Sequence, residues 1–115
     1  MMRAKFSRRL IRQVRVRVPD GAGGYGAAWQ ERGALWGDVD GRSGGRRVTE
    51  PGSETRLKAR ITIHALPQNH PDRPRPGDRL RDGARRYAVE AVHESDETGR
   101  YLVCFASEVT EGAGT

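Results

Sequence analysis

Apolar and polar residues alternate with a period of two along much of the chain, which is the spacing of β-strands. Val14, Val16 and Val18 alternate with two arginines, so this segment has one apolar face and one basic face. Five further segments carry strand signals, and the last of them is apolar on both faces, which predicts a central strand. These segments are residues 35–39, 57–64, 79–81, 87–92 and 101–106.

Turn residues separate the expected strands. The Asp82-Gly83 pair predicts a tight hairpin, and three segments are too rich in Gly or Pro to form strands: 19–26, 41–54 and 67–77. Helical turns are expected only at residues 5–11 and 27–32. The pattern therefore predicts a mostly β protein, a small single-domain β-barrel or sandwich of about six antiparallel strands with long loops and little helix.

The composition fits one domain with a modest core and an Arg-rich surface. The chain has 115 residues, 35% of them hydrophobic, a net charge of +6, and 19 arginines among its 21 basic residues. Residues 1–19 are basic without an acid, whereas residues 90–115 hold six acids against one Arg. The asymmetry predicts either a basic arm for nucleic acid or a head-to-tail contact between subunits. Codon bias in a GC-rich genome equally explains the excess of Arg over Lys.

The candidate chemistry points away from catalysis. Cys104 is the single cysteine, lies in an apolar run and predicts a small core residue without a disulfide. The glycines at 21, 23 and 26 fit a dinucleotide-binding pattern, but no βαβ unit surrounds them. His64, His70 and His93 have no metal-ligand spacing. We expect no enzyme, no cofactor, no metal, no membrane contact, and synthesis in the cytosol.

A basic barrel with aromatic side chains also fits a second class, the OB-like or Sm-like modules that bind single-stranded nucleic acid. Tyr87, Tyr101 and Phe105 occupy positions expected to lie in the core. Tyr25, Trp29 and Trp36 remain as candidate platforms for stacked bases. This binding-module function stands as the alternative to a subunit of an assembly.

Several short motifs follow one another in an informative order. They are LIRQVRV at 10–16, YGAAW at 25–29, LWGDV at 35–39, RITIH at 60–64, RLRDGARRYAV at 79–89 and YLVCF at 101–105. This order resembles the head–tail joining proteins of tailed phages and gene transfer agents, which are also called head-closure or stopper proteins. Each motif is weak by itself, and the resemblance rests on their succession across nearly the whole chain.

The resemblance implies a structural subunit of the neck of a phage or phage-like particle. In such a particle the barrel forms a ring with copies of itself, between portal or adaptor proteins on the head side and a tail or tail-terminator protein on the tail side. The ring closes the head, retains packaged double-stranded DNA and docks the tail. A loop that projects into the channel in relatives corresponds here to residues 41–54.

These implications define the expected regions and contacts. We expect a basic N-terminal arm at 1–9, a barrel domain at 10–108 with the projecting loop at 41–54, and a flexible tail at 109–115. The channel-facing, DNA-facing residues are expected to be Arg42, Arg46 and Arg47. The subunit interface is expected at basic and aromatic positions, namely Arg8, Arg9, Arg15, Arg17, Trp29, Trp36, Arg73 and Arg75.

Overall fold

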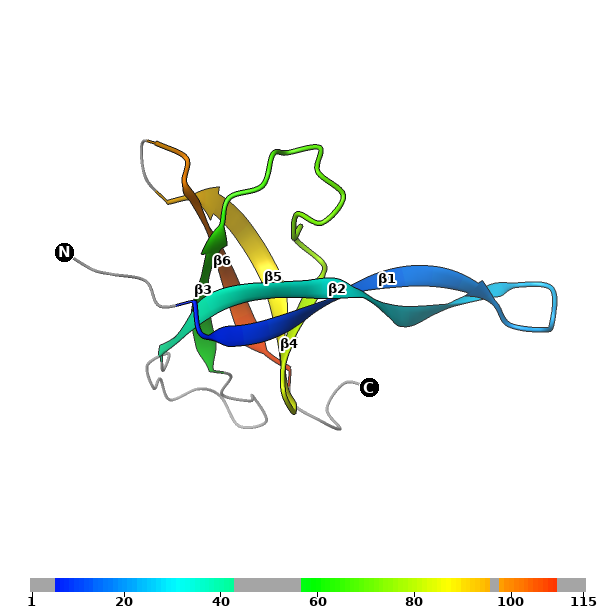
Figure 1. Cartoon of the computed structure of the whole chain (residues 1–115). Helices are drawn as coiled ribbons and strands as arrows, with labels where there is room; N and C mark the ends of the chain where they lie inside the picture. The colour runs from blue at the N-terminus through cyan, green and yellow to red at the C-terminus, as the bar shows by residue number, and fades with distance from the viewer. Residues whose placement is uncertain (1–5, 43–56, 96–97, 110–115) are drawn as a thin grey trace.

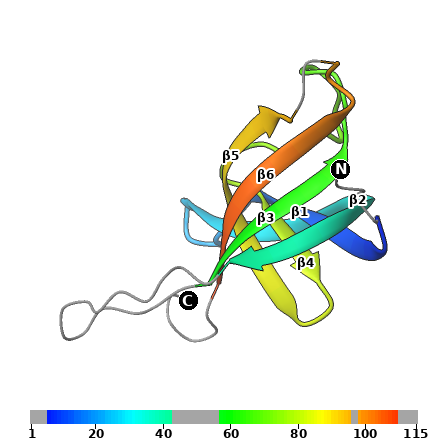
Figure 2. The same cartoon turned by 90° about the vertical axis from the view of Figure 1, so that its left-hand side faces the viewer.

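The structure is a closed, six-stranded antiparallel β-barrel (Figures 1 and 2). A computed structural model describes residues 6–42, 57–95 and 98–109, and these ranges contain no helix. The strands are β1 (Arg8–Pro19), β2 (Tyr25–Arg42), β3 (Lys58–His64), β4 (Arg79–Asp82), β5 (Arg85–Glu94) and β6 (Tyr101–Glu108). They follow one another around the barrel in the order β1-β2-β3-β6-β5-β4. The predicted fold class is confirmed.

The core lies inside the barrel and is built from the inward half of each alternating strand. Its fully buried side chains come from five strands and include Leu10, Ile61, Ile63, Leu80, Tyr87, Leu102 and Cys104. Leu35 and Val39 of β2 pack against them from the sixth. The alternation that predicted the strand at 57–64 therefore also identifies which of its residues point inward.

The helical turns expected at residues 5–11 and 27–32 are wrong within the described residues. Arg8 to Ile11 pair with residues 34–37, and residues 27–31 pair with β1, so both segments are strands. The register shifts by one residue between Ile11 and Gln13, because β2 carries an extra residue there. Gly33 in this bulge has φ of +125°, a conformation that side chains with a Cβ rarely adopt. Because Gly33 adopts this conformation, β2 continues through the bulge as one long strand, where the sequence predicted a helical turn at residues 27–32.

The hairpin predicted at Asp82-Gly83 is present. Asp82 pairs with Arg85, which leaves Gly83 and Ala84 as a two-residue loop. Gly83 has φ of +64° and no non-glycine residue described has a positive φ. A positive φ at the first loop position alone is the pattern of a type II′ turn, which suits the twist of paired strands.

Gly37 is a position where the barrel wall has no room for a side chain. A Cβ added there would lie 2.8 Å from the backbone oxygen of Thr62 and 2.9 Å from Cγ2 of Ile63. We expect Gly37→Ala to lower the free energy of unfolding by about 1–3 kcal/mol, because β2 must move away from β3. Urea denaturation checks this. Gly26→Ala in the same strand meets nothing within 4 Å and should be close to neutral; equal effects of the two variants would contradict the packing argument.

The buried thiol of Cys104 gives a second test of the core. Burial raises the pKa of Cys104 from 9.0 to about 12, so at any given pH below 9 the folded chain holds about a thousandfold less thiolate than a free thiol. We expect a thiol reagent at pH 8 to modify the folded chain very slowly and the urea-unfolded chain at once. Rapid, complete modification of the folded chain would show that the barrel opens at β6.

Candidate assembly surfaces

The hairpin of β1 and β2 runs far past the barrel (Figure 1). β1 pairs with β4 only through Ile11, Arg12 and Gln13, and β2 pairs with β3 only from Gly37 onward. We call residues 14–30 the arm; it is a different segment from the basic N-terminal arm expected at residues 1–9. Its strands extend about 20 Å beyond Gln13, at roughly 3.3 Å per residue. Sequence patterning predicted a strand at 14–18 and a Gly-rich turn after it, but not that both stand clear of the barrel.

One face of the arm is basic and aromatic. Arg15 pairs with Trp29 and Arg17 with Ala27, so these side chains share a face. The guanidinium of Arg17 lies over the ring of Tyr25, 4.3 Å from its centroid. That of Arg79, in β4, lies 4.1 Å from the centroid of Trp29. The arginines thus stiffen the aromatic side chains through cation–π contacts.

The other face of the arm is aliphatic. Val14, Val16 and Val18 lie opposite Gln30, Ala28 and Gly26 of β2, and we call the three valines with Ala28 the valine stripe. In β1, Leu10 and Arg12 point into the barrel and the valines continue the same side of the strand. The stripe is therefore the core-facing side of β1 carried beyond the core, and all four side chains stay partly exposed.

The tip of the arm is preorganised by Asp20. Its Oδ1 accepts hydrogen bonds from the backbone N–H groups of Ala22, at 2.8 Å, and Gly24, at 3.0 Å. These two bonds hold the pKa of Asp20 below its usual value, and the bond from Ala22 has the larger effect. The backbone N–H of Asp20 also donates to the carbonyl of Gly24. The Gly-rich turn is thus a defined loop between two antiparallel strands.

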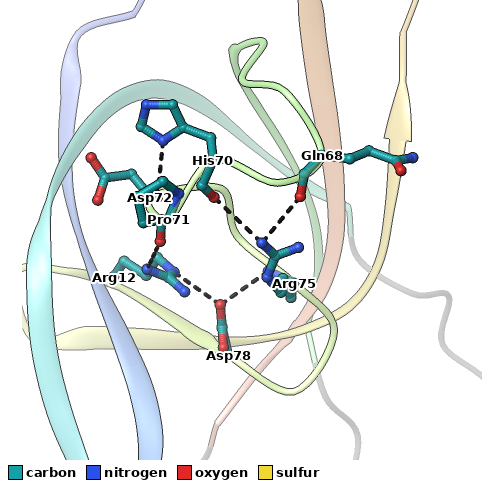
Figure 3. A network of polar contacts seen from close by, with 7 residues as sticks. All are labelled: Arg12, Gln68, His70, Pro71, Asp72, Arg75 and Asp78. Carbon is teal, nitrogen blue, oxygen red and sulfur yellow. Dashed lines mark hydrogen bonds and ion pairs between the residues drawn. The ribbon is translucent and has the colours of Figure 1, made fainter.

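The base of the arm is fixed by a buried ion pair (Figure 3). Arg12 Nε donates to Asp78 Oδ2 at 2.9 Å, and Arg12 Nη1 donates to the carbonyl oxygen of Pro71 at 2.9 Å. Both side chains are about nine-tenths buried. Asp78 Oδ2 also accepts from the backbone N–H of Arg75 at 3.0 Å. One inward-facing arginine therefore ties β1 to the Pro-rich segment, residues 67–77, which folds over this end of the barrel.

The Pro-rich segment uses its own arginines to hold its shape. Arg73 is buried and its Nη1 donates to the carbonyl oxygen of Leu66 at 2.8 Å. Arg75 donates through Nη2 to the carbonyl oxygens of Gln68 and His70 (Figure 3). Because Arg73 is enclosed by its own loop, we leave it out of the proposed subunit interface.

The remaining expected interface residues lie on the barrel wall. Trp36 is 54% exposed and pairs with Arg9 in β1, which makes a second basic and aromatic site. Arg8 forms an exposed ion pair with Asp82, 2.8 Å between Nη2 and Oδ2.

Arg42 is the last residue of β2, and Arg46 and Arg47, with the rest of the expected channel loop, lie outside the described residues.

Phe105 was expected in the core, and the structure places it on the outside. It alternates with the buried Cys104 and Ala106 of β6 and is 37% exposed. Its ring meets His93 edge-on, 5.4 Å between ring centroids, and Arg60 lies 5.7 Å from its centroid. Two hollows, of about 240 and 430 Å³, flank it. We call this surface, with Lys58, Arg60, Glu90, His93 and Glu94, the Phe105 face.

Tyr101 also faces outward, in contrast to the expectation, and stacks on Phe6 with ring centroids 5.6 Å apart. Only Tyr87 of the three aromatics expected inside is part of the core. The sequence holds no signal that separates these cases, because residues 101–106 are apolar on both faces of the strand.

No group of three or more acidic, His or Cys side chains that could hold a metal occurs among residues 6–42, 57–95 and 98–109. The same residues contain no helix that could cross a membrane. What the described surface offers instead is exposed aromatic and aliphatic side chains on an arm and on the barrel wall. These are the side chains that protein–protein contacts use, and a small all-β barrel presents them.

Comparison with known proteins identifies the family. Residues 1–109 match the phage head completion proteins, and the chain belongs to that family. A solved structure described as the virion of a native gene transfer agent particle contains a chain 40% identical to this one, with a TM-score of 0.75. The alignment covers 95% of this chain and 98% of that chain. The search of curated proteins finds no match. The resemblance inferred from the motif order is confirmed, and the chain is a structural protein of a phage-like particle.

Proposed function

We propose that this chain is the neck subunit that closes the head of a phage-like particle. Copies form a ring between the portal or adaptor and the tail, retain the packaged DNA and dock the tail protein. The observation that carries the proposal is the 40% identity, over nearly the full length of both chains, to a chain of an assembled gene transfer agent particle. Membership of the head completion family supports the same place in assembly.

The described surfaces support a role in contacts between subunits and give no support to catalysis. The arm has an exposed strand pair with two different faces, and a two-stranded ribbon is marginal in water unless something packs on it. Neighbouring subunits supply that packing in an assembly. The chain is made in the bacterial cytoplasm and ends in the particle, and the DNA-facing role of Arg42, Arg46 and Arg47 is part of this proposal.

The alternative, a module that binds single-stranded nucleic acid, needs aromatic rings that bases can stack on. Arg79 already covers one side of Trp29 and Arg17 one side of Tyr25, which makes these rings poorer platforms. Fluorescence anisotropy of the isolated chain with a single-stranded oligonucleotide separates the two functions. The neck function predicts weak binding that is lost at moderate salt; tight binding that Trp29→Ala abolishes would favour the alternative.

The direct test is deletion of the gene in a producing strain, with complementation by the full-length chain. We expect electron microscopy of the deletion strain to show tailless heads that have lost DNA, beside free tails. Complementation should restore joined particles. Complete, DNA-filled particles in the deletion strain would refute the neck function, because the head is then closed without this chain.

A further inference from the structure

Outward-facing arginines form one continuous stripe over β1, β4 and β5. Leu10 of β1, Leu80 of β4 and Tyr87 of β5 are buried, and the residues on either side of an inward side chain in a strand face outward. We call the outward arginines of these three strands the arginine stripe: Arg9, Arg15, Arg17, Arg79, Arg81 and Arg86. Each of them is exposed or half-buried, so the stripe is accessible from outside the barrel.

Strand pairing sets these arginines side by side. Arg81 lies directly opposite Arg86. Arg79 joins the barrel wall to the arm, because its guanidinium lies 4.1 Å from the ring centroid of Trp29, and Trp29 pairs in turn with Arg15. The stripe thus continues from the wall onto the arm, and its β1 part alone is about 26 Å long at roughly 3.3 Å per residue.

The chain supplies little negative charge to balance the stripe. Among the described residues that face outward from β1, β4 and the part of β2 paired with β1, the one acid is Glu31. Its Oε2 accepts a hydrogen bond from Nε of Arg81 at 3.1 Å. Arg81 still lies opposite Arg86, and like charges in directly opposite positions repel each other. An anion laid over the stripe relieves this repulsion.

The rest of the described surface is nearly neutral. Outside the stripe, the described basic residues are matched by an almost equal number of acids. On β3, for example, Lys58 forms an ion pair with Glu90, and Arg60 lies opposite Asp40 of β2. This side of the barrel is in front in Figure 2, with β1 behind it. Within the described residues, the excess of positive charge is therefore gathered on one side of the barrel.

Two arginines of the stripe are held in place before any ligand binds. The guanidinium of Arg17 lies 4.3 Å from the ring centroid of Tyr25, and that of Arg79 lies over Trp29. A side chain held against an aromatic ring loses less conformational freedom when it binds an anion. The rings therefore position the arginines and are not required as platforms for bases.

We propose that the arginine stripe binds the phosphate backbone of the packaged double-stranded DNA, an inference that rests on the proposed neck function. A guanidinium presents paired N–H donors that fit phosphate oxygens, and phosphate contacts hold a duplex without reading its sequence. A subunit that retains DNA of any sequence needs this kind of contact. The stripe is a DNA contact separate from the expected channel loop at 41–54.

The charge pattern selects DNA over a neighbouring copy as the occupant. The basic N-terminal part of the sequence is compatible with either partner. A second copy would have to present a row of acids of similar length, and the described surface of this chain has none. Arg9, Arg15 and Arg17, which were expected at the subunit interface, are therefore assigned to DNA.

Fluorescence anisotropy of the isolated full-length chain with a short labelled duplex of arbitrary sequence is the first test. We expect binding at low salt, with a slope of log affinity against log salt of about −3 to −5, at roughly −0.9 per neutralised phosphate. The chain with Arg15→Gln and Arg17→Gln should bind about tenfold more weakly, with a slope smaller by about two.

The matched control carries Lys58→Gln and Arg60→Gln, which remove the same charge from the nearly neutral side of the barrel. All four substituted side chains are exposed, so both chains should fold, by circular dichroism. The affinity of the control should stay within about twofold of wild type, because salt screens charges far from the duplex. Equal weakening by the two double variants, or no weakening by the stripe variant, overturns the proposal.

Photo-cross-linking in assembled particles identifies the occupant directly. A diazirine-bearing lysine analogue replaces Arg17 in one chain and Arg60 in a control chain. We expect irradiation to join the chain to DNA from position 17 and not from position 60. No DNA adduct from position 17, or equal DNA adducts from both positions, overturns the proposal. An adduct to another protein in place of DNA would show that the stripe contacts an acidic partner.

In each of these outcomes the chain is still present in the particle, so the neck function stands. Absence of the wild-type chain from particles is the separate result that refutes the function.

Discussion

Arg12→Ala is expected to lower the free energy of unfolding by about 3–5 kcal/mol, because it leaves the buried carboxylate of Asp78 without its charge partner. Arg12 also holds the carbonyl of Pro71, so the Pro-rich segment loses its tie to β1 at the same time. A domain of this size is stable by about 5–15 kcal/mol. The variant therefore loses a substantial share of its stability, and urea or thermal unfolding measures the loss.

The matched control is Lys58→Ala, which breaks the ion pair with Glu90 on the surface. Both side chains are at least half exposed, so the loss should cost less than about 1 kcal/mol. The variant with both Arg12→Ala and Asp78→Ala should be less destabilised than the sum of the two single variants. If Arg12→Ala is as mild as Lys58→Ala, the ion pair is not what fixes the Pro-rich segment.

Removal of the arm is expected to abolish particle function while leaving the barrel folded. Val14 and Gln30 are directly paired, so an Asn-Gly turn that replaces residues 15–29 joins them as a two-residue hairpin. The core cluster contains no residue of the replaced segment, so cooperative unfolding should persist with a small change of the thermal midpoint. Gene transfer or infectivity of the complemented deletion strain should fall to background.

Asp20→Asn is the control for the arm experiment. It keeps an Oδ1 that accepts from the N–H groups of Ala22 and Gly24, so the full-length arm retains its tip and function should be normal. Normal transfer by the armless chain would show that the arm is dispensable, and would leave the barrel alone as the working part. Loss of cooperative unfolding would instead show that the arm is part of the fold.

The fold was largely predictable because period-two alternation is local and the core depends on it. Ile61 and Ile63 alternate with polar residues in sequence and point inward in the barrel. The hairpin at Asp82-Gly83 was predictable for the same local reason, since Gly83 supplies the positive φ. The length of β2 was not, because its continuity depends on pairing with β1 and on the bulge at Gly33.

The candidate surfaces were predictable only in part. Arg15, Arg17 and Trp29 were expected at an interface, and the structure brings them together on one face of the arm. Val14, Val16 and Val18 are half-buried, as alternation indicated, but alternation cannot tell where a barrel ends along a strand. Phe105 was assigned to the core because both faces of its strand are apolar in sequence. Which of those faces lies outside is decided by closure of the barrel, in which β6 pairs with β3 on one side and with β5 on the other.

A cryo-electron microscopy map of the neck of the purified particle tests the central claim most directly. We predict copies of this barrel in one closed ring between the portal side and the tail, with the arms in contact with neighbouring subunits. A map in which the neck is complete without this chain, or in which the chain occupies the capsid surface or the tail tip as separate copies, would contradict the account.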